Sequence, residues 1–199
     1  MTHLDPRADP RAVRSRASLA AAVLELASER PIGEITVAEL ATRAQVNRST
    51  FYQHASSPAA LLRSVLSDEL DAIRDRYLSE LAARDIRAAL NAVTVAVLEH
   101  VQAHRAIYRR SLPAIEESAG LHAMLGSHFE VSARVLLEQH RIELPAHDGR
   151  IVPLATAARY IAYGVVGAIE AWVTEEPPRP LDDLVSDIRL LLPAWWPIG

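Results

Sequence analysis

The fold of this chain is decided by residues 36–54, which read TVAELATRAQVNRSTFYQH. Apolar residues recur three and four positions apart on either side of a short polar interruption, which is the period of an α-helix. The Thr36 hydroxyl can accept a hydrogen bond from the backbone N–H of Glu39, and the Glu39 carboxylate can accept one in return, so this pair predicts a helix start. Asn47 is a favoured N-cap for a second helix over 48–54. Two short helices joined by a tight turn predict a helix-turn-helix.

The second of these helices has one apolar and one polar side. We expect Val46 and Phe51 to pack inward against the first helix. The opposite side carries donors suited to the major groove, where Gln pairs with adenine, Arg with guanine, and Ser or Thr with a base or a phosphate. The predicted DNA-contacting residues are Thr36, Arg48, Ser49, Thr50, Tyr52, Gln53 and His54, with Tyr52 and His54 placed for phosphates. A solvated helical hairpin within a larger bundle has the same pattern and remains the alternative.

The rest of the chain continues the helical period and shows no strand-like alternation. We therefore expect an all-α protein, with a three-helix helix-turn-helix domain followed by a helical bundle. The expected helices cover 13–29, 58–77, 85–104, 106–112, 121–140, 153–175 and 182–192, separated by Pro, Gly and polar residues. A loop is expected over 141–150. The predicted domains are a flexible arginine-containing tail (1–12), the helix-turn-helix domain (13–60) and the bundle (61–199).

The composition excludes several classes of protein. Because there is no cysteine among 199 residues, disulfide scaffolds, thiolate zinc sites and thiol nucleophiles are excluded. The longest apolar run, residues 160–169, is far shorter than the roughly 20 residues of a membrane span. The N-terminus lacks the apolar segment of a signal peptide, so we expect a cytoplasmic protein with no membrane contact. The arginines at 7, 11, 14 and 16 can reach a phosphate backbone or form a solvated tail.

Catalytic and metal-binding patterns are weak. The sequence has no Ser-His-Asp spacing of recognisable type, no phosphate-binding glycine loop and no paired-carboxylate motif, so we expect no enzyme. His100 and His104 are one helical turn apart and can meet one metal ion, but two ligands are too few for a site. We therefore expect no metal and no cofactor. A helical metal- or cofactor-binding sensor, in which the N-terminal hairpin is only structural, remains the alternative function.

Residues 36–54, followed by a helix that begins near Pro58, resemble the N-terminal DNA-binding domain of the tetracycline-repressor (TetR) family. The resemblance covers about residues 14–65. The chain departs from the family pattern at Gln45, where the turn often has Gly, and at Pro58, where Lys or Arg is common. The remaining two-thirds is similar only in outline, with residues 164–172 similar to the family's penultimate helix.

The resemblance implies a homodimeric transcription regulator that binds a palindromic operator. It further implies that a small-molecule effector enters the C-terminal ligand-binding and dimerisation domain and shifts the dimer to a conformer that no longer fits the DNA. On this basis we expect a repressor whose effector is unknown.

Two sets of residues in the C-terminal part are candidates for these roles. Aromatic and histidine side chains among apolar helices are typical of a ligand cavity, and the candidates are His104, Tyr108, His128, Phe129, Tyr163 and Trp172. Small residues at helical spacing let a second helix approach closely, and the candidates for a four-helix dimer interface are Gly164, Ala168, Ala171, Leu184, Ile188 and Leu191. Packing within one chain is the alternative for both sets.

Overall fold

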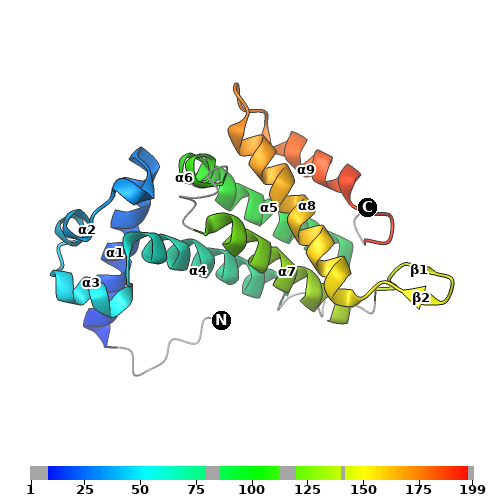
Figure 1. The fold of residues 1–199 in the computed structure, drawn as a ribbon, viewed down its shortest axis with the longest axis horizontal. Helices are drawn as coiled ribbons and strands as arrows, with labels where there is room; N and C mark the ends of the chain where they lie inside the picture. The colour runs from blue at the N-terminus through cyan, green and yellow to red at the C-terminus, as the bar shows by residue number, and fades with distance from the viewer. Residues whose placement is uncertain (1–8, 79–85, 113–119, 140–141, 197–199) are drawn as a thin grey trace. The chain divides into compact units, whose positions relative to one another are not determined.

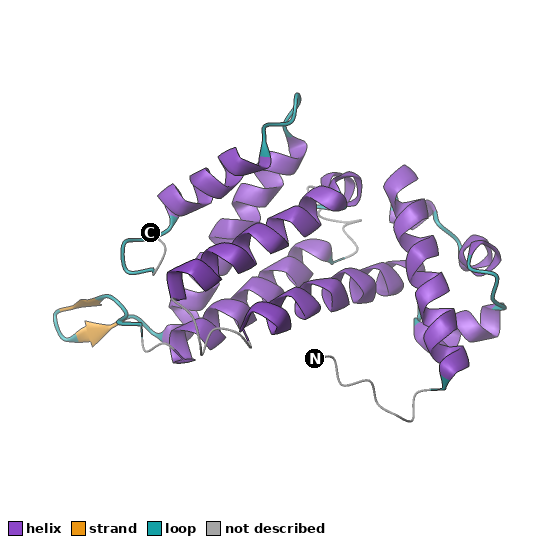
Figure 2. Ribbon diagram, turned by 180° about the vertical axis from the view of Figure 1, so that it is seen from behind, coloured by secondary structure: helices purple, strands orange, loops and turns teal. Residues whose placement is uncertain are grey.

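The computed structural model describes residues 9–78, 86–112, 120–139 and 142–196, and α-helices make up most of them (Figures 1 and 2). The helices are α1 (Pro10–Glu29), α2 (Val37–Arg43), α3 (Arg48–His54), α4 (Pro58–Leu78), α5 (Ile86–Ala103), α6 (Arg105–Ser111), α7 (Leu121–Gln139), α8 (Leu154–Thr174) and α9 (Leu181–Leu191), with a 3-10 turn, η1 (Ile32–Glu34), between α1 and α2. The all-α prediction is confirmed. None of the described helices is long and apolar enough to cross a membrane.

Helix α1 begins earlier than the sequence indicated. The Asp9 side chain accepts a hydrogen bond from the backbone N–H of Arg11 at 2.9 Å, and Pro10 occupies the first helical position. Proline fits there because the first turn has no use for its missing N–H. Residues 10–12, which we assigned to a tail, are therefore helical, whereas residues 1–8 lie outside the described part.

A second correction concerns the expected loop before α8, which contains a small antiparallel hairpin. Strand β1 (Ala146–His147) pairs with β2 (Arg150–Ile151). The two turn residues between them, Asp148 and Gly149, have positive φ angles of 50° and 75°. Such a pair of left-handed residues is typical of the type I′ turn, for which Asp-Gly is a preferred sequence. Strands of two residues are too short to show the alternation that predicts a strand.

The chain divides into two compact units. The first consists of residues 1–69 and 104–121, and the second of residues 70–103 and 122–199. The boundary that the sequence predicts, between residues 60 and 61, falls inside the continuous helix α4. Within the first unit, α2 and α3 pack against α1 (Figure 1).

Helix α6 also belongs to the first unit, although it is distant in sequence from α1. The Arg110 guanidinium of α6 donates hydrogen bonds to the backbone carbonyls of Ala27 and Ser28 in the last turn of α1. Those carbonyls have no partner within α1, so Arg110 satisfies acceptors that the helix end leaves open. Arg16 of α1 forms an ion pair with Asp68 of α4. These bonds hold α1 against two helices that follow the DNA-binding sequence.

The second unit has its own apolar core, formed by α5, α7, α8, α9 and the segment after α9. Its buried side chains include Leu90, Leu136, Ala158, Ile161 and Trp196. The indole N–H of Trp172 in α8 donates to the backbone carbonyl of Arg179 at 3.1 Å. Trp172 is therefore a core side chain with a satisfied polar group, which anchors the α8–α9 connection.

Candidate functional site

The first helix of the helix-turn-helix starts on the capping box that the sequence predicts. The Thr36 hydroxyl accepts from the Glu39 N–H at 3.2 Å, and a Glu39 carboxylate oxygen accepts from the Thr36 N–H at 3.0 Å. The carboxylate also accepts from the Arg30 guanidinium. This bond to Arg30, together with those from Thr36, lowers the pKa of Glu39 from 4.5 to about 2. The charged carboxylate at the start of α2 also matches the positive end of the helix dipole.

The turn between α2 and α3 is closed by a residue in the left-handed region. Gln45 has a φ of 55°, and the N–H of Val46 donates to the Ala41 carbonyl at 2.9 Å. A residue with a Cβ pays a steric cost in this conformation that glycine does not. The backbone hydrogen bond of the turn is therefore formed, but the backbone of Gln45 is strained.

Replacing Gln45 by glycine should raise the free energy of unfolding by about 1 kcal/mol, because it relieves the left-handed strain. Thermal unfolding of the two proteins measures the change. Gly33→Ala is the reverse control, since a Cβ at Gly33 meets no atom within 4 Å and this glycine has no positive φ. A lower melting temperature for Gln45→Gly would show that the Gln45 side chain contributes more than its backbone costs.

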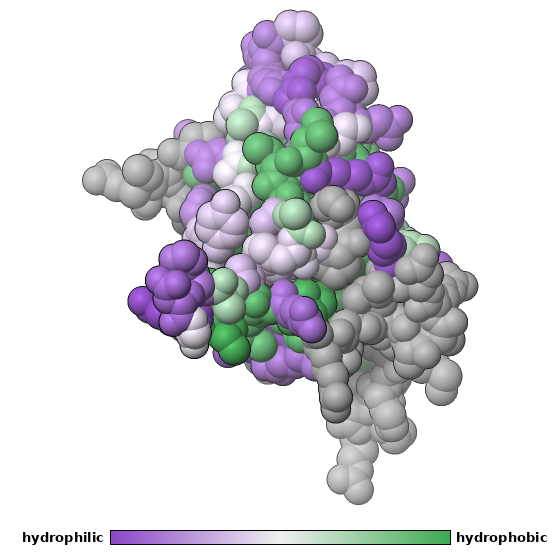
Figure 3. Space-filling model, turned by 90° about the vertical axis from the view of Figure 1, so that its right-hand side faces the viewer, coloured by the Kyte–Doolittle hydropathy of each residue, from purple (hydrophilic) through white to green (hydrophobic). Residues whose placement is uncertain are grey.

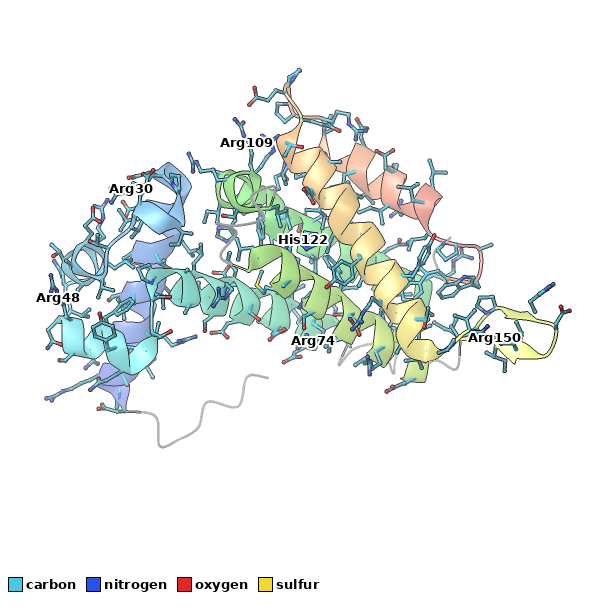
Figure 4. All side chains as sticks on the ribbon, viewed as in Figure 1. Arg30, Arg48, Arg74, Arg109, His122 and Arg150 are labelled. Atoms are coloured by element: carbon cyan, nitrogen blue, oxygen red, sulfur yellow. The ribbon has the colours of Figure 1, made fainter. Side chains whose placement is uncertain are left out.

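Helix α3 presents its polar side to solvent. Asn47 caps it by accepting from the Thr50 N–H at 2.7 Å. Phe51 is fully buried, whereas the next residue, Tyr52, is 60% exposed. Arg48, Ser49 and Gln53 are exposed beside Tyr52, and Arg48 points away from the neighbouring helices in Figure 4. Four donor-bearing side chains on one short exposed helix can enter a major groove together.

Several predicted DNA contacts have partners within the chain, and the exposed Ser49 is one of them, because its hydroxyl donates to Asn47 Oδ1 at 2.6 Å. The His54 ring nitrogen Nε2 lies 2.8 Å from the Ser15 hydroxyl, so this half-buried histidine ties α3 to α1. Thr36 serves the capping box, and Thr50 is half-buried. The exposed polar surface of α3 therefore consists of Arg48, Ser49, Tyr52 and Gln53, while His54 is half-buried at the end of this helix and Thr36 caps α2.

The ligand candidates do not form one cluster. His128 and Phe129 of α7 both line a cavity of about 70 Å³ in the second unit, among side chains of α5, α8 and α9. Tyr163 lies outside this cavity and its ring covers Gly126, where a Cβ would come within 2.8 Å of the tyrosine Cζ. Trp172 is core. His104 and Tyr108 belong to the first unit, where the His104 Nε2 lies 2.9 Å from Glu69 Oε2 and Tyr108 is buried.

The six candidates for the dimer interface also differ in how exposed they are. Leu184 and Ile188 are buried within their own chain, although Ile188 also lines an open groove between α8 and α9. Gly164 and Ala171 are exposed and Ala168 is half-buried. Leu191 is 72% exposed at the end of α9.

Two further exposed residues of α8 and α9, Tyr160 and Leu190, were not among the predicted dimer residues. Both are exposed, Leu190 by 84%, and Tyr160 is four residues before Gly164. An open apolar groove runs between the outer sides of α8 and α9, lined by Tyr160, Tyr163, Gly164, Ala168 and Leu191. Figure 3, which views the side where α9 and the hairpin lie, shows hydrophobic residues at the surface among hydrophilic ones. We call Tyr160, Gly164, Ala168, Ala171, Leu190 and Leu191 the α8–α9 outer face.

Comparisons with known proteins agree with this arrangement. Residues 19–65 match the sequence profile described as "Bacterial regulatory proteins, tetR family". No curated protein sequence is significantly similar to the chain. Among solved structures, a fatty acid degradation regulator, FadR, from Bacillus halodurans has a TM-score of 0.67 at 16% identity, covering 93% of this chain and 95% of its own.

Two further solved structures show the same fold. FadR from Thermus thermophilus, a TetR-family transcriptional repressor in complex with lauroyl-CoA, has a TM-score of 0.63 at 22% identity, with 88% of this chain and 92% of that chain covered. The dihydroxyacetone kinase operon activator DhaS has a TM-score of 0.64 at 14% identity, with 89% and 93% covered.

Helices α2 and α3, with the exposed polar side of α3, form a helix-turn-helix motif. Residues 19–65 match the tetR family of bacterial regulatory proteins, and the described helices have the fold of TetR-family transcriptional regulators.

Proposed function

We propose that two copies of this chain bind a two-fold symmetric DNA operator through α3, repress transcription there, and release the DNA when a small molecule binds the second unit. The observation that carries the proposal is the exposed polar side of α3, where Arg48, Ser49, Tyr52 and Gln53 stand free of the core that Phe51 anchors. Helices of this kind read base edges, while side chains at their margins hold phosphates.

The α8–α9 outer face supports the dimeric part of the proposal. Its leucines and Tyr160 expose apolar surface, and its small residues leave room for a facing helix. A cyclic pair with the same patch on both partners is the commonest soluble assembly. Two copies would present two α3 helices to DNA, and we expect half-site centres about 34–36 Å apart when these occupy successive major grooves.

Two variants distinguish a residue that reads a base from a residue that binds the phosphate backbone. Gln53→Ala should cost about 1–3 kcal/mol of binding free energy and relax the preference at one base position in each half-site. Tyr52→Phe removes only a hydroxyl, which we place on a phosphate, so it should weaken binding to all sequences alike. Titration against a set of singly substituted operators measures both. A uniform loss from Gln53→Ala would reassign this residue to the backbone.

An effector site in the second unit is supported by the cavity beside His128. A pocket with mostly apolar walls and a few oriented polar groups is typical of a small-molecule site. The Thermus relative contains lauroyl-CoA, but here the cavity measures about 70 Å³ and, among the described residues, no charged side chain lines it. We therefore propose a smaller effector. To shift the populations of the two dimer conformers from 1:99 to 99:1, the effector must bind one conformer more favourably than the other by about 5.5 kcal/mol.

A metal- or cofactor-binding sensor with a purely structural hairpin is the second candidate. It would bind its metal or cofactor without any preference among DNA sequences. The exposed α3 side chains favour DNA binding, because a structural hairpin needs no cluster of uncovered donors.

A further inference from the structure

We propose that the cavity beside His128 takes a small uncharged molecule with one hydroxyl group, and that this hydroxyl donates its hydrogen bond to Nε2 of His128. The inference rests on the proposed effector function and names the chemical class of the ligand. Its starting point is that a histidine only 6% exposed forms part of a wall that is apolar apart from the hydroxyls of Thr94 and Ser132.

The partner of His128 fixes which ring nitrogen is free. Nδ1 lies 3.3 Å from the Asp71 carboxylate of α4, and this carboxylate also pairs with Arg74 at 2.8 Å. A carboxylate held by a guanidinium accepts hydrogen bonds, so Nδ1 carries the proton. Burial lowers the pKa of His128, against the opposing effect of the Asp71 hydrogen bond. The ring is therefore neutral at neutral pH, with a lone pair on Nε2.

That lone pair has no protein partner in the described structure. Among the described residues, Asp71 is the sole hydrogen-bond partner of the ring, and the ring forms the cavity wall. An unpaired acceptor on a mostly apolar cavity wall gains a hydrogen bond from a ligand that donates to it, and gains none from a ligand without a donor. The acceptor thus selects a donor, and the hydroxyl is the smallest donor that an apolar molecule can carry.

The rest of the wall decides charge and size. Leu90, Val97, Phe129, Ile161, Ile188 and Trp196 supply its apolar surface, and no Arg, Asp or Glu among the described residues lines it. A carboxylate or an amine would be buried without a counter-charge, which is strongly unfavourable. The volume of about 70 Å³ is about half that of an engineered cavity of roughly 150 Å³ that binds benzene. We therefore expect a ligand no larger than a single ring, which fits when the half-buried Phe129 side chain rotates away from the cavity.

The test compares phenol with toluene, which have the same shape and differ in a hydroxyl against a methyl group. Titration of the full-length protein by calorimetry or ligand-observed NMR should show phenol binding about tenfold more tightly than toluene, the factor that one net hydrogen bond supplies. Benzoate should not bind. Equal affinities for phenol and toluene, binding of benzoate in preference to both, or no binding of phenol would overturn the proposal.

Three variants locate the effect. His128→Phe should abolish the preference for phenol while keeping toluene binding. Asp71→Asn, at a partly exposed position, should reduce the preference because an amide no longer fixes the histidine tautomer; it tests the same claim should His128→Phe fail to fold. His122→Phe is the matched control, since this half-exposed histidine of α7 does not line the cavity (labelled, like Arg74, in Figure 4). An unchanged preference in His128→Phe would contradict the assignment.

Measuring release of the operator DNA distinguishes a failure of this inference from a failure of the proposed function. If phenol binds with the expected preference but the protein stays on its operator, the coupling between cavity and DNA fails while the ligand class stands. If a charged compound releases the operator and phenol does not bind, the effector function stands and the ligand class is wrong.

Discussion

Gly164→Arg should convert the proposed dimer to a monomer of 21.8 kDa and weaken operator binding by about 10²–10⁴-fold, the gain that linking two half-site contacts supplies. Gly164 is exposed at the middle of the α8–α9 outer face, and a Cβ built on it meets no atom of its own chain within 4 Å. The substitution therefore leaves the monomer intact. Glycine is also a poor helix former, so the variant should keep or gain about 0.5–1 kcal/mol of stability.

Ala155→Arg is the matched control for this variant. Ala155 is exposed in the first turn of α8 and, nine residues before Gly164, lies on the opposite side of the helix. Sedimentation at micromolar concentration should show a dimer for Ala155→Arg and a monomer for Gly164→Arg. A dimer in both cases would place the interface elsewhere on the chain.

Phe51→Ala should destabilise the first unit by about 3–5 kcal/mol, the usual cost of truncating a fully buried phenylalanine. Phe51 is 0% exposed and joins α3 to the α1 and α2 core. Its neighbour Tyr52 contacts it edge-on, with ring centroids 5.4 Å apart, but is itself mostly exposed. Tyr52→Phe keeps that ring contact and should leave the melting temperature unchanged.

Chemical denaturation with a probe in the first unit separates these two variants. Phe51→Ala should abolish DNA binding because α3 is no longer packed firmly against α1 and α2. Tyr52→Phe should weaken DNA binding while the protein stays fully folded. If Phe51→Ala unfolded at the same denaturant concentration as the wild type, the helix-turn-helix would be held by contacts other than this ring.

Local signals in the sequence were sufficient for the DNA-binding end of the chain. The capping box at Thr36 and Glu39, the N-cap at Asn47 and the proline at 58 each act within one helical turn, so they predicted the starts of α2, α3 and α4. The Asp148-Gly149 turn was also local, but two-residue strands give no periodicity, and the hairpin was missed.

Long-range packing explains the remaining differences. Periodicity indicates that Leu184 and Ile188 share one side of α9, but it does not say whether that side meets its own chain or a partner, and in the structure it meets its own core. Likewise, nothing in the sequence places Arg110 against the end of α1, or Trp196 in the wall beside His128. Such contacts depend on how distant helices come together.

The central claim, that a dimer reads a symmetric operator through α3, is tested most directly by selecting bound fragments from randomised DNA with the purified full-length protein. We predict a shared inverted repeat with half-site centres about 34–36 Å apart, and a repeat of the same spacing with one relaxed position in each half when the selection uses Gln53→Ala. Fragments with no common sequence, or a single half-site without its inverted copy, would contradict the account.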